Sequence, residues 1–178
     1  MFAIVLAALD RSGSVLPILC AMAVHELAHI VMMLACGGQV RRLTLRFADL
    51  QIAASVLGYR QELLSALAGP LVNLICGAAF CMQRPSFAAY SLMLGIYNLL
   101  PVWPLDGGRV LRCALLARLP ITQAEHISEI VSFAACAVLL LIGVFLTFFR
   151  KSGLWPLGTA AYLTVRLLML ARRTDAVQ

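Results

Sequence analysis

Long runs of apolar residues without charged side chains alternate along the chain with short polar segments rich in arginine. A transmembrane helix needs about 20 consecutive and mainly apolar residues. Five runs reach or approach that length, and we expect them to form the membrane spans Val15–Cys36, Leu63–Cys81, Ser86–Leu105, Ile130–Phe149 and Leu154–Leu170. The pattern therefore predicts an all-α polytopic membrane protein.

The first apolar segment, Phe2–Leu9, is too short to cross a membrane as a regular helix, and Asp10 and Arg11 close it. It lacks the basic start and the small-residue cleavage site of a signal peptide. We count it as a shortened first segment, which gives about six transmembrane segments. We expect one membrane-embedded domain over residues 1–173 and a short tail over 174–178.

The stretch between segments 2 and 3, Gln39–Arg60, is polar enough to leave the hydrocarbon. Within it, Val40–Ile52 alternates apolar and polar residues partly with period two, which is typical of a strand. The pattern fits a small β-hairpin at the inner surface and a solvated connecting loop equally well. A hairpin would offer an edge to which an extended peptide can pair.

The composition agrees with a membrane protein, because 62% of the 178 residues are hydrophobic, 12% are charged and the mean hydropathy is +0.94. Soluble domains carry about 45–50% apolar and about 25% charged residues. A globule of this size could not cover so much apolar surface, and a disordered chain contains far less of it. Both classes are excluded.

The formal net charge of +6 comes from basic residues at the ends of the apolar runs. They form no stripe interleaved with aromatic side chains, so we expect no nucleic-acid partner. The positive-inside rule places the N- and C-termini in the cytoplasm, with Arg150 and Lys151 as an exception on the outer side.

The cysteines form no CxxC pair, and nearly all of them lie inside apolar runs. We interpret them as small hydrophobic side chains in helices rather than as disulfide partners or zinc ligands. They are Cys20, Cys36, Cys76, Cys81, Cys113 and Cys136.

The chemistry of the chain is concentrated in His25-Glu26-Leu27-Ala28-His29, in the middle of an apolar run. Residues four apart on a helix lie on one face, so both imidazoles can reach one metal ion, and Glu26 can act as a general base beside it. Ionisable groups inside a membrane are costly and usually functional. The alternative is a buried His–Glu hydrogen-bonding cluster.

A catalytic zinc site needs a third protein ligand and an open position. Asp106 lies in a segment, Asn98–Arg109, whose two prolines and two glycines are expected to end a helix and let the carboxylate turn toward the histidines. The alternative for Asp106 is an Asp-Gly turn at the membrane surface. His126 fits better as an interfacial residue near Glu125 and Glu129, at the polar start of the next helix.

Three motifs, HELAH, Ala68–Asn73 and Asn98–Gly108, together resemble the site-2 protease family of intramembrane zinc metalloproteases, peptidase family M50, and within it the sporulation branch. The resemblance implies Zn²⁺ held by His25, His29 and Asp106, with Glu26 as the base. It also implies that Asn73 and Asn98 hold the substrate backbone or the catalytic water.

The residues themselves leave alternatives to these roles. Each of the two asparagines fits a helix–helix hydrogen bond equally well, because an amide in an apolar run needs partners. We expect Gly69 and Gly77 to permit close helix packing.

The activity that the resemblance implies is hydrolysis of a peptide bond in a membrane-tethered substrate in a bacterial cell membrane. The sporulation branch implies a pro-sigma factor as substrate and integral membrane proteins as inhibitors, with anti-sigma factors and remnant signal peptides as alternatives. We expect no CBS domain, although this branch often carries one, which puts nucleotide control in doubt. A metal transporter and a catalytically silent relative are the rival interpretations.

Overall fold

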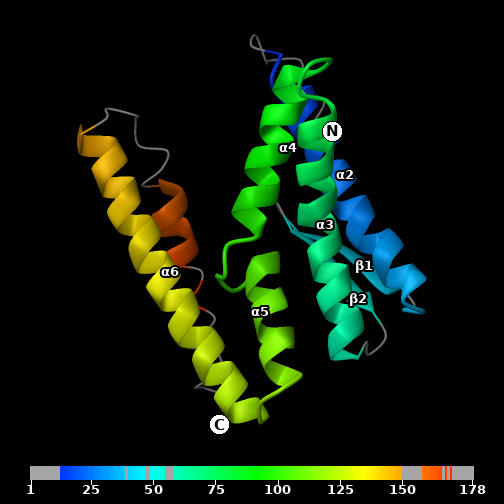
Figure 1. Ribbon diagram of the computed structural model, residues 1–178, viewed down its shortest axis with the longest axis vertical. Coiled ribbons are helices and arrows are strands. Elements are labelled where there is room, and N and C mark those ends of the chain that lie inside the picture. The colour runs from blue at the N-terminus through cyan, green and yellow to red at the C-terminus, as the bar shows by residue number, and fades with distance from the viewer. Residues whose placement is uncertain are drawn as a thin grey trace. The chain divides into compact units, whose positions relative to one another are not determined.

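The computed structural model describes residues 13–38, 40–46, 49–54, 58–149 and 158–165, together with 167 and 169. It consists of two compact units, Met1–Leu99 and Leu100–Gln178, and each is described by itself. The first contains α2 (Val15–Ala35), β1 (Val40–Arg46), β2 (Asp49–Ala54), α3 (Tyr59–Ala79) and α4 (Pro85–Asn98); the second contains α5 (Asp106–Leu116) and α6 (Ile121–Phe149) (Figure 1). The expected first segment, Phe2–Leu9, lies outside the described residues.

In the first unit, α2, α3 and α4 pack against one another, and glycines allow the close approach of α3 and α4. A Cβ atom added to Gly77 would lie 2.7 Å from Cδ2 of Leu92, and one added to Gly95 would lie 3.0 Å from the carbonyl oxygen of Pro70. Small residues at such contacts are a general device of helix packing in membranes. The expectation that Gly77 permits close helix packing is therefore confirmed.

The stretch Val40–Ile52, which fitted both a hairpin and a connecting loop by its sequence, contributes to a two-stranded antiparallel sheet. Leu43 pairs with Ile52 and Arg46 with Asp49, and the register is irregular between Val40 and Arg42. Among the described residues, neither outer edge of this two-stranded sheet pairs with another strand.

In the second unit, α5 packs on α6, and an ion pair joins them. Nε of Arg112 donates to Oε1 of Glu125 at 2.9 Å and to Oε2 at 3.2 Å. The loop before α5 is also held in place, because the backbone N–H of Trp103 donates to Oγ of Ser132 on α6 at 3.1 Å. Val102 in this loop is fully buried. These contacts fix the backbone from which α5 begins.

The expected span Ser86–Leu105 is too long, because α4 ends at Asn98. Pro101 and Pro104 lack the N–H that a helix needs and disfavour helical backbone in the residues before them. A helix does end in the segment Asn98–Arg109, as expected, but its two glycines belong to the next helix, because Asp106 is the first residue of α5.

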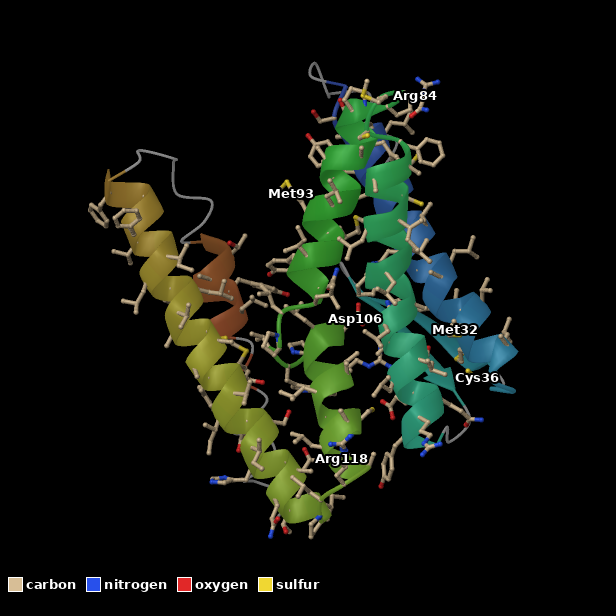
Figure 2. The ribbon with its side chains drawn as sticks, in the orientation of Figure 1. Met32, Cys36, Arg84, Met93, Asp106 and Arg118 are labelled. Carbon is tan, nitrogen blue, oxygen red and sulfur yellow. The ribbon has the colours of Figure 1, made fainter. Side chains whose placement is uncertain are left out.

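Three described helices are long and apolar enough to cross a membrane: Val15–Ala35, Tyr59–Ala79 and Ile121–Phe145. Large apolar side chains cover their outer faces, for instance Leu27, Ile75 and Leu141, and Met93 on α4 is exposed in the same way (Figure 2). Such faces are suited to lipid rather than water. The structure is that of an integral membrane protein, and the number of six spans stays a prediction. The described part of the expected span Leu154–Leu170 is helical.

Candidate metal centre

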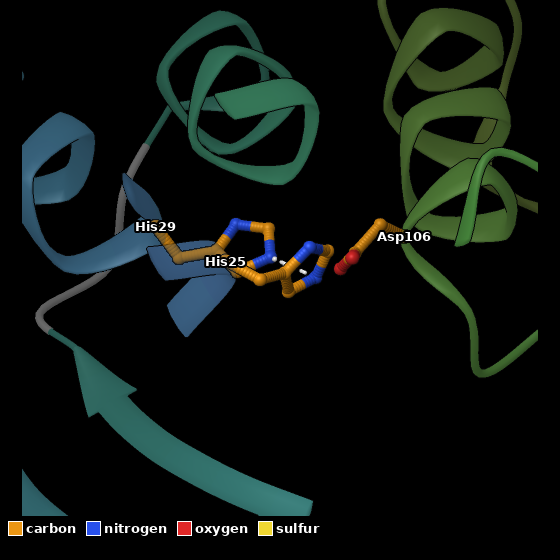
Figure 3. A group of neighbouring side chains, drawn as sticks. All are labelled: His25, His29 and Asp106. Atoms are coloured by element: carbon orange, nitrogen blue, oxygen red, sulfur yellow. Dashed lines mark hydrogen bonds between the residues drawn. The ribbon is translucent and has the colours of Figure 1, made fainter. Parts of the chain in front are cut away.

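Two buried imidazoles meet on one face of α2. His25 and His29 are 4% and 8% exposed, and their Nε2 atoms lie 3.1 Å apart, as the dashed line in Figure 3 marks. The ring centroids are 4.7 Å apart and the planes are nearly perpendicular. The spacing of four residues on a helix brings both Nε2 atoms to one point, as expected from the sequence.

Three residues of α3, each four apart, form a cradle for these rings. Nδ1 of His29 donates to the backbone carbonyl of Ser65 at 2.7 Å, and the side-chain amide of Asn73 lies 3.3 Å from Nδ1 of His25. Gly69 lies midway, and a Cβ added there would be 2.6 Å from Cε1 of His29 and 2.9 Å from Cε1 of His25. The absence of a side chain at Gly69 therefore makes room for both imidazoles.

The hydrogen bond to Ser65 sets the tautomer of His29. A carbonyl oxygen only accepts, so Nδ1 carries the proton and Nε2 keeps its lone pair. A histidine that donates one ring N–H to the protein and directs the other nitrogen to a metal ion is the usual arrangement of a metal site. His29 thus fits a metal ion by its own chemistry.

Glu26 directly follows His25 and is the one acidic residue of α2. Its side chain is half-buried within a helix long enough to span the membrane. A carboxylate in such a place is costly unless it has a function or a partner. Its role as a general base stays a prediction.

Asp106 belongs to the second unit, where it is buried at the N-terminus of α5. Nη1 of Arg109 lies 3.6 Å from its Oδ1. A carboxylate in the first turn is favoured by the partial positive charge of the helix N-terminus. Gly108 presses this turn against the preceding loop, since a Cβ there would lie 2.6 Å from the backbone N of Trp103. The position of the carboxylate in this unit is therefore well defined.

The other residues singled out by the sequence fall in different surroundings. His126 is exposed on α6 and belongs to no group of three metal-binding side chains among the described residues. Nδ2 of Asn98 donates to the carbonyl of Leu94 at 3.1 Å within its own helix, whereas Asn73 bridges two helices. All the cysteines are free, and Cys113 and Cys136 are the buried ones.

Sequence reasoning missed Ser65 and the role of Gly69 beside the imidazoles. The signal for them is the repeat of small or polar residues at every fourth position, Ser65, Gly69 and Asn73, which matches the spacing of the two histidines. That repeat gains its meaning only once α3 is known to pack on α2.

Figure 3 shows the side chains of His25, His29 and Asp106. Each of them offers one ligand atom of the kind that zinc binds in catalytic sites. An HExxH pair on a helix is a zinc-binding motif typical of metalloproteases, and here both of its histidines are buried on an apolar helix.

Comparison with known proteins leads to the same class. Residues 84–142 match the family model described as peptidase family M50. Zinc metalloprotease MJ0392 of Methanocaldococcus jannaschii is 26% identical over 133 residues, covering 67% of this chain and 39% of that protein. Stage IV sporulation protein FB of Bacillus subtilis is 28% identical over 138 residues, covering 70% of this chain and 47% of that protein.

A third relative, the putative zinc metalloprotease Rip3 of Mycobacterium tuberculosis, is 31% identical over 125 residues, covering 60% of this chain and 32% of that protein. The chain thus spans less than half the length of the curated relatives it matches. Among solved structures, the site-2 protease from Methanocaldococcus jannaschii superposes with a TM-score of 0.68 at 20% identity, covering 94% of this chain and 83% of that one, which shows a shared fold. These matches support the assignment of the chain to the site-2 protease family.

Proposed function

We propose that this protein is an intramembrane zinc metalloprotease that hydrolyses a peptide bond in a membrane-tethered substrate. The observation that carries the proposal is the buried imidazole pair of α2, with converging Nε2 atoms and Glu26 alongside. The family assignment and the printed names of the relatives support metalloendopeptidase activity.

The metal ligands in this proposal are His25, His29 and Asp106. Two imidazole nitrogens and a carboxylate oxygen, with one position left open, form a common donor set of catalytic zinc. When bound, zinc polarises the scissile carbonyl and makes water more acidic.

The chain's own residues supply the proton transfers and the positioning. Glu26 takes a proton from the attacking water and returns it to the leaving amine, which is general base and then general acid catalysis by one carboxylate. Asn98 is our candidate for holding the substrate backbone or the water, as the family resemblance implies. The apolar surroundings of α2 exclude bulk water, which strengthens every charge interaction in the reaction.

The two-stranded sheet offers a way to hold the substrate. The backbone carbonyls of a transmembrane helix are hydrogen-bonded within the helix, so the substrate must unwind before hydrolysis. An unwound segment can pair by strand addition with an open edge of β1 or β2.

The substrate we propose is a membrane-tethered pro-sigma factor cleaved during sporulation. The similarity to stage IV sporulation protein FB supports this choice over an anti-sigma factor or a remnant signal peptide. The proposal includes integral membrane proteins as inhibitors, a bacterial cell membrane as location and both chain termini in the cytoplasm.

The deciding experiment is co-expression of the protein with candidate membrane-tethered transcription factors, comparing wild type with Glu26→Gln. The variant should bind zinc like wild type and leave the substrate intact, because Gln keeps the shape of Glu but accepts no proton. Full cleavage by Glu26→Gln would refute the proposed mechanism. A transporter would need a second site along its path, and the described residues contain one group of three metal-binding side chains.

A further inference from the structure

The amide of Asn73 occupies an unusual position in the first unit. It is fully buried between helices, and its Nδ2 lies 3.3 Å from Nδ1 of His25. Its Oδ1 is buried without a hydrogen-bond partner among the described residues. A buried acceptor without a partner is costly, so a state of the protein that gives Oδ1 a donor would favour the other orientation of the amide.

In that orientation the polar groups form one continuous chain. The three distances fit one assignment of the protons, in which Nδ2 of Asn73 donates to Nδ1 of His25, Nε2 of His25 donates to Nε2 of His29, and Nδ1 of His29 donates to the carbonyl of Ser65. In this assignment the proton of His25 is on Nε2. This tautomer cannot offer the Nε2 lone pair of His25 to a metal ion.

Zinc binding by both histidines requires the other tautomer of His25. With Nε2 bound to the metal, a neutral imidazole carries its proton on Nδ1 and becomes a donor there. The Nδ2 group of Asn73 is also a donor, so the two would face each other without an acceptor. Rotation of the amide by about half a turn exchanges its two ends and brings Oδ1 to Nδ1.

We propose that Asn73 is the positioning residue of His25, and that its amide turns over when zinc binds so that Oδ1 accepts the Nδ1 proton of His25. This inference rests on the proposed zinc site. It differs from the substrate-holding role that the family resemblance implies, because Asn73 then acts through His25.

The surroundings of Asn73 can accommodate the turned amide. Ser91 on α4 carries the other buried polar atom that lacks a partner among the described residues, its Oγ. Two contacts join α3 and α4 on either side of Asn73: Pro70 lies against Gly95, and Gly77 lies against Ala88. Ser91 lies between Ala88 and Gly95 on α4, in the same stretch of the helix contact. Oδ1 of Asn73 and Oγ of Ser91 make no hydrogen bond with each other, so the displaced Nδ2 would reach this hydroxyl only after a change of the Ser91 rotamer.

The test measures zinc affinity of the detergent-solubilised full chain by competition with a chelator. Asn73→Leu and Asn73→Ala remove the acceptor, and each should weaken zinc binding about 10–100-fold, the usual effect of losing such a partner. Asn73→Asp should bind zinc at least as tightly as wild type, because a carboxylate accepts from Nδ1 in either orientation. Helical circular dichroism of the zinc-free variants checks that each one folds.

A control is Thr164→Val, which removes a hydroxyl whose Oγ1 donates to the carbonyl of Ala160 within its own helix and which should leave zinc affinity unchanged. Wild-type affinity in Asn73→Leu and Asn73→Ala would overturn the inference. Equal weakening in Asn73→Asp and Asn73→Leu would overturn it too, since a packing role predicts no rescue. A wild-type protein that binds no zinc would instead contradict the proposed function.

Discussion

Replacing Gly69 by alanine tests whether the space beside the imidazoles is needed for metal binding. The added Cβ would lie 2.6 Å from Cε1 of His29 and 2.9 Å from Cε1 of His25, while ordinary contact begins at 3.4 Å. The two rings would have to move by about 0.8 Å and 0.5 Å, whereas metal–ligand distances tolerate about 0.2 Å.

Overpacking a tight site of this kind costs about 1–3 kcal/mol. If the rings take up the strain, zinc affinity falls by about 5- to 150-fold, because about 1.4 kcal/mol corresponds to a factor of ten. Chelator competition on the purified protein in detergent measures this loss, and thermal melting of the zinc-free protein measures the loss of stability.

The matched control is Gly77→Ala, which crowds the same helix against Leu92 and Ala88 on α4. We expect it to lower the melting temperature while leaving the zinc affinity of the folded protein unchanged. If Gly69→Ala binds zinc like wild type and melts at the same temperature, α3 does not cradle the imidazoles. If both alanine variants weaken zinc equally, the effect of Gly69→Ala is general loosening of the bundle.

The remaining predictions concern the second unit and the metal. Asp106→Ala should lower zinc content measured by atomic emission, whereas His126→Ala should keep it; the reverse result would make His126 the third ligand. Ser132→Ala removes the acceptor of the Trp103 N–H and should weaken zinc binding by about tenfold or less, since one neutral hydrogen bond contributes about 0.5–1.5 kcal/mol; an unchanged affinity would mean that this bond does not position Asp106. Removing zinc with a chelator should abolish cleavage and adding it back should restore it, and cleavage by the metal-free protein would contradict a metal-dependent reaction.

The membrane helices could be predicted from the sequence because their lengths follow from the thickness of the bilayer. The expected span Val15–Cys36 became α2, Val15–Ala35, and Leu63–Cys81 overlaps α3, Tyr59–Ala79. The helix α5 was missed because two glycines follow its first residue, Asp106, and because it carries two arginines. It is held by the Arg112–Glu125 ion pair and by the fit of Gly108 against the preceding loop, which are contacts beyond its own residues.

In the candidate site, too, some features follow from the local sequence and others depend on contacts between helices. His25 and His29 could be paired from the sequence because they lie one helical turn apart. The partners of their Nδ1 atoms, Ser65 and Asn73, lie 36 and 48 residues away along the chain. These partners are determined by the packing of α3 on α2. The local sequence pattern identifies Asn73 as a polar residue in an apolar run, but it does not identify His25 as its partner.

The acceptor that holds His29 is a main-chain oxygen at position 65 rather than a side chain. Replacing Ser65 by alanine would leave that oxygen in place, so alanine scanning would understate how much the imidazole depends on this position. Replacing the amide that follows residue 65 by an ester, which weakens the carbonyl as an acceptor, is the kind of chemical change that would expose the contribution of the backbone.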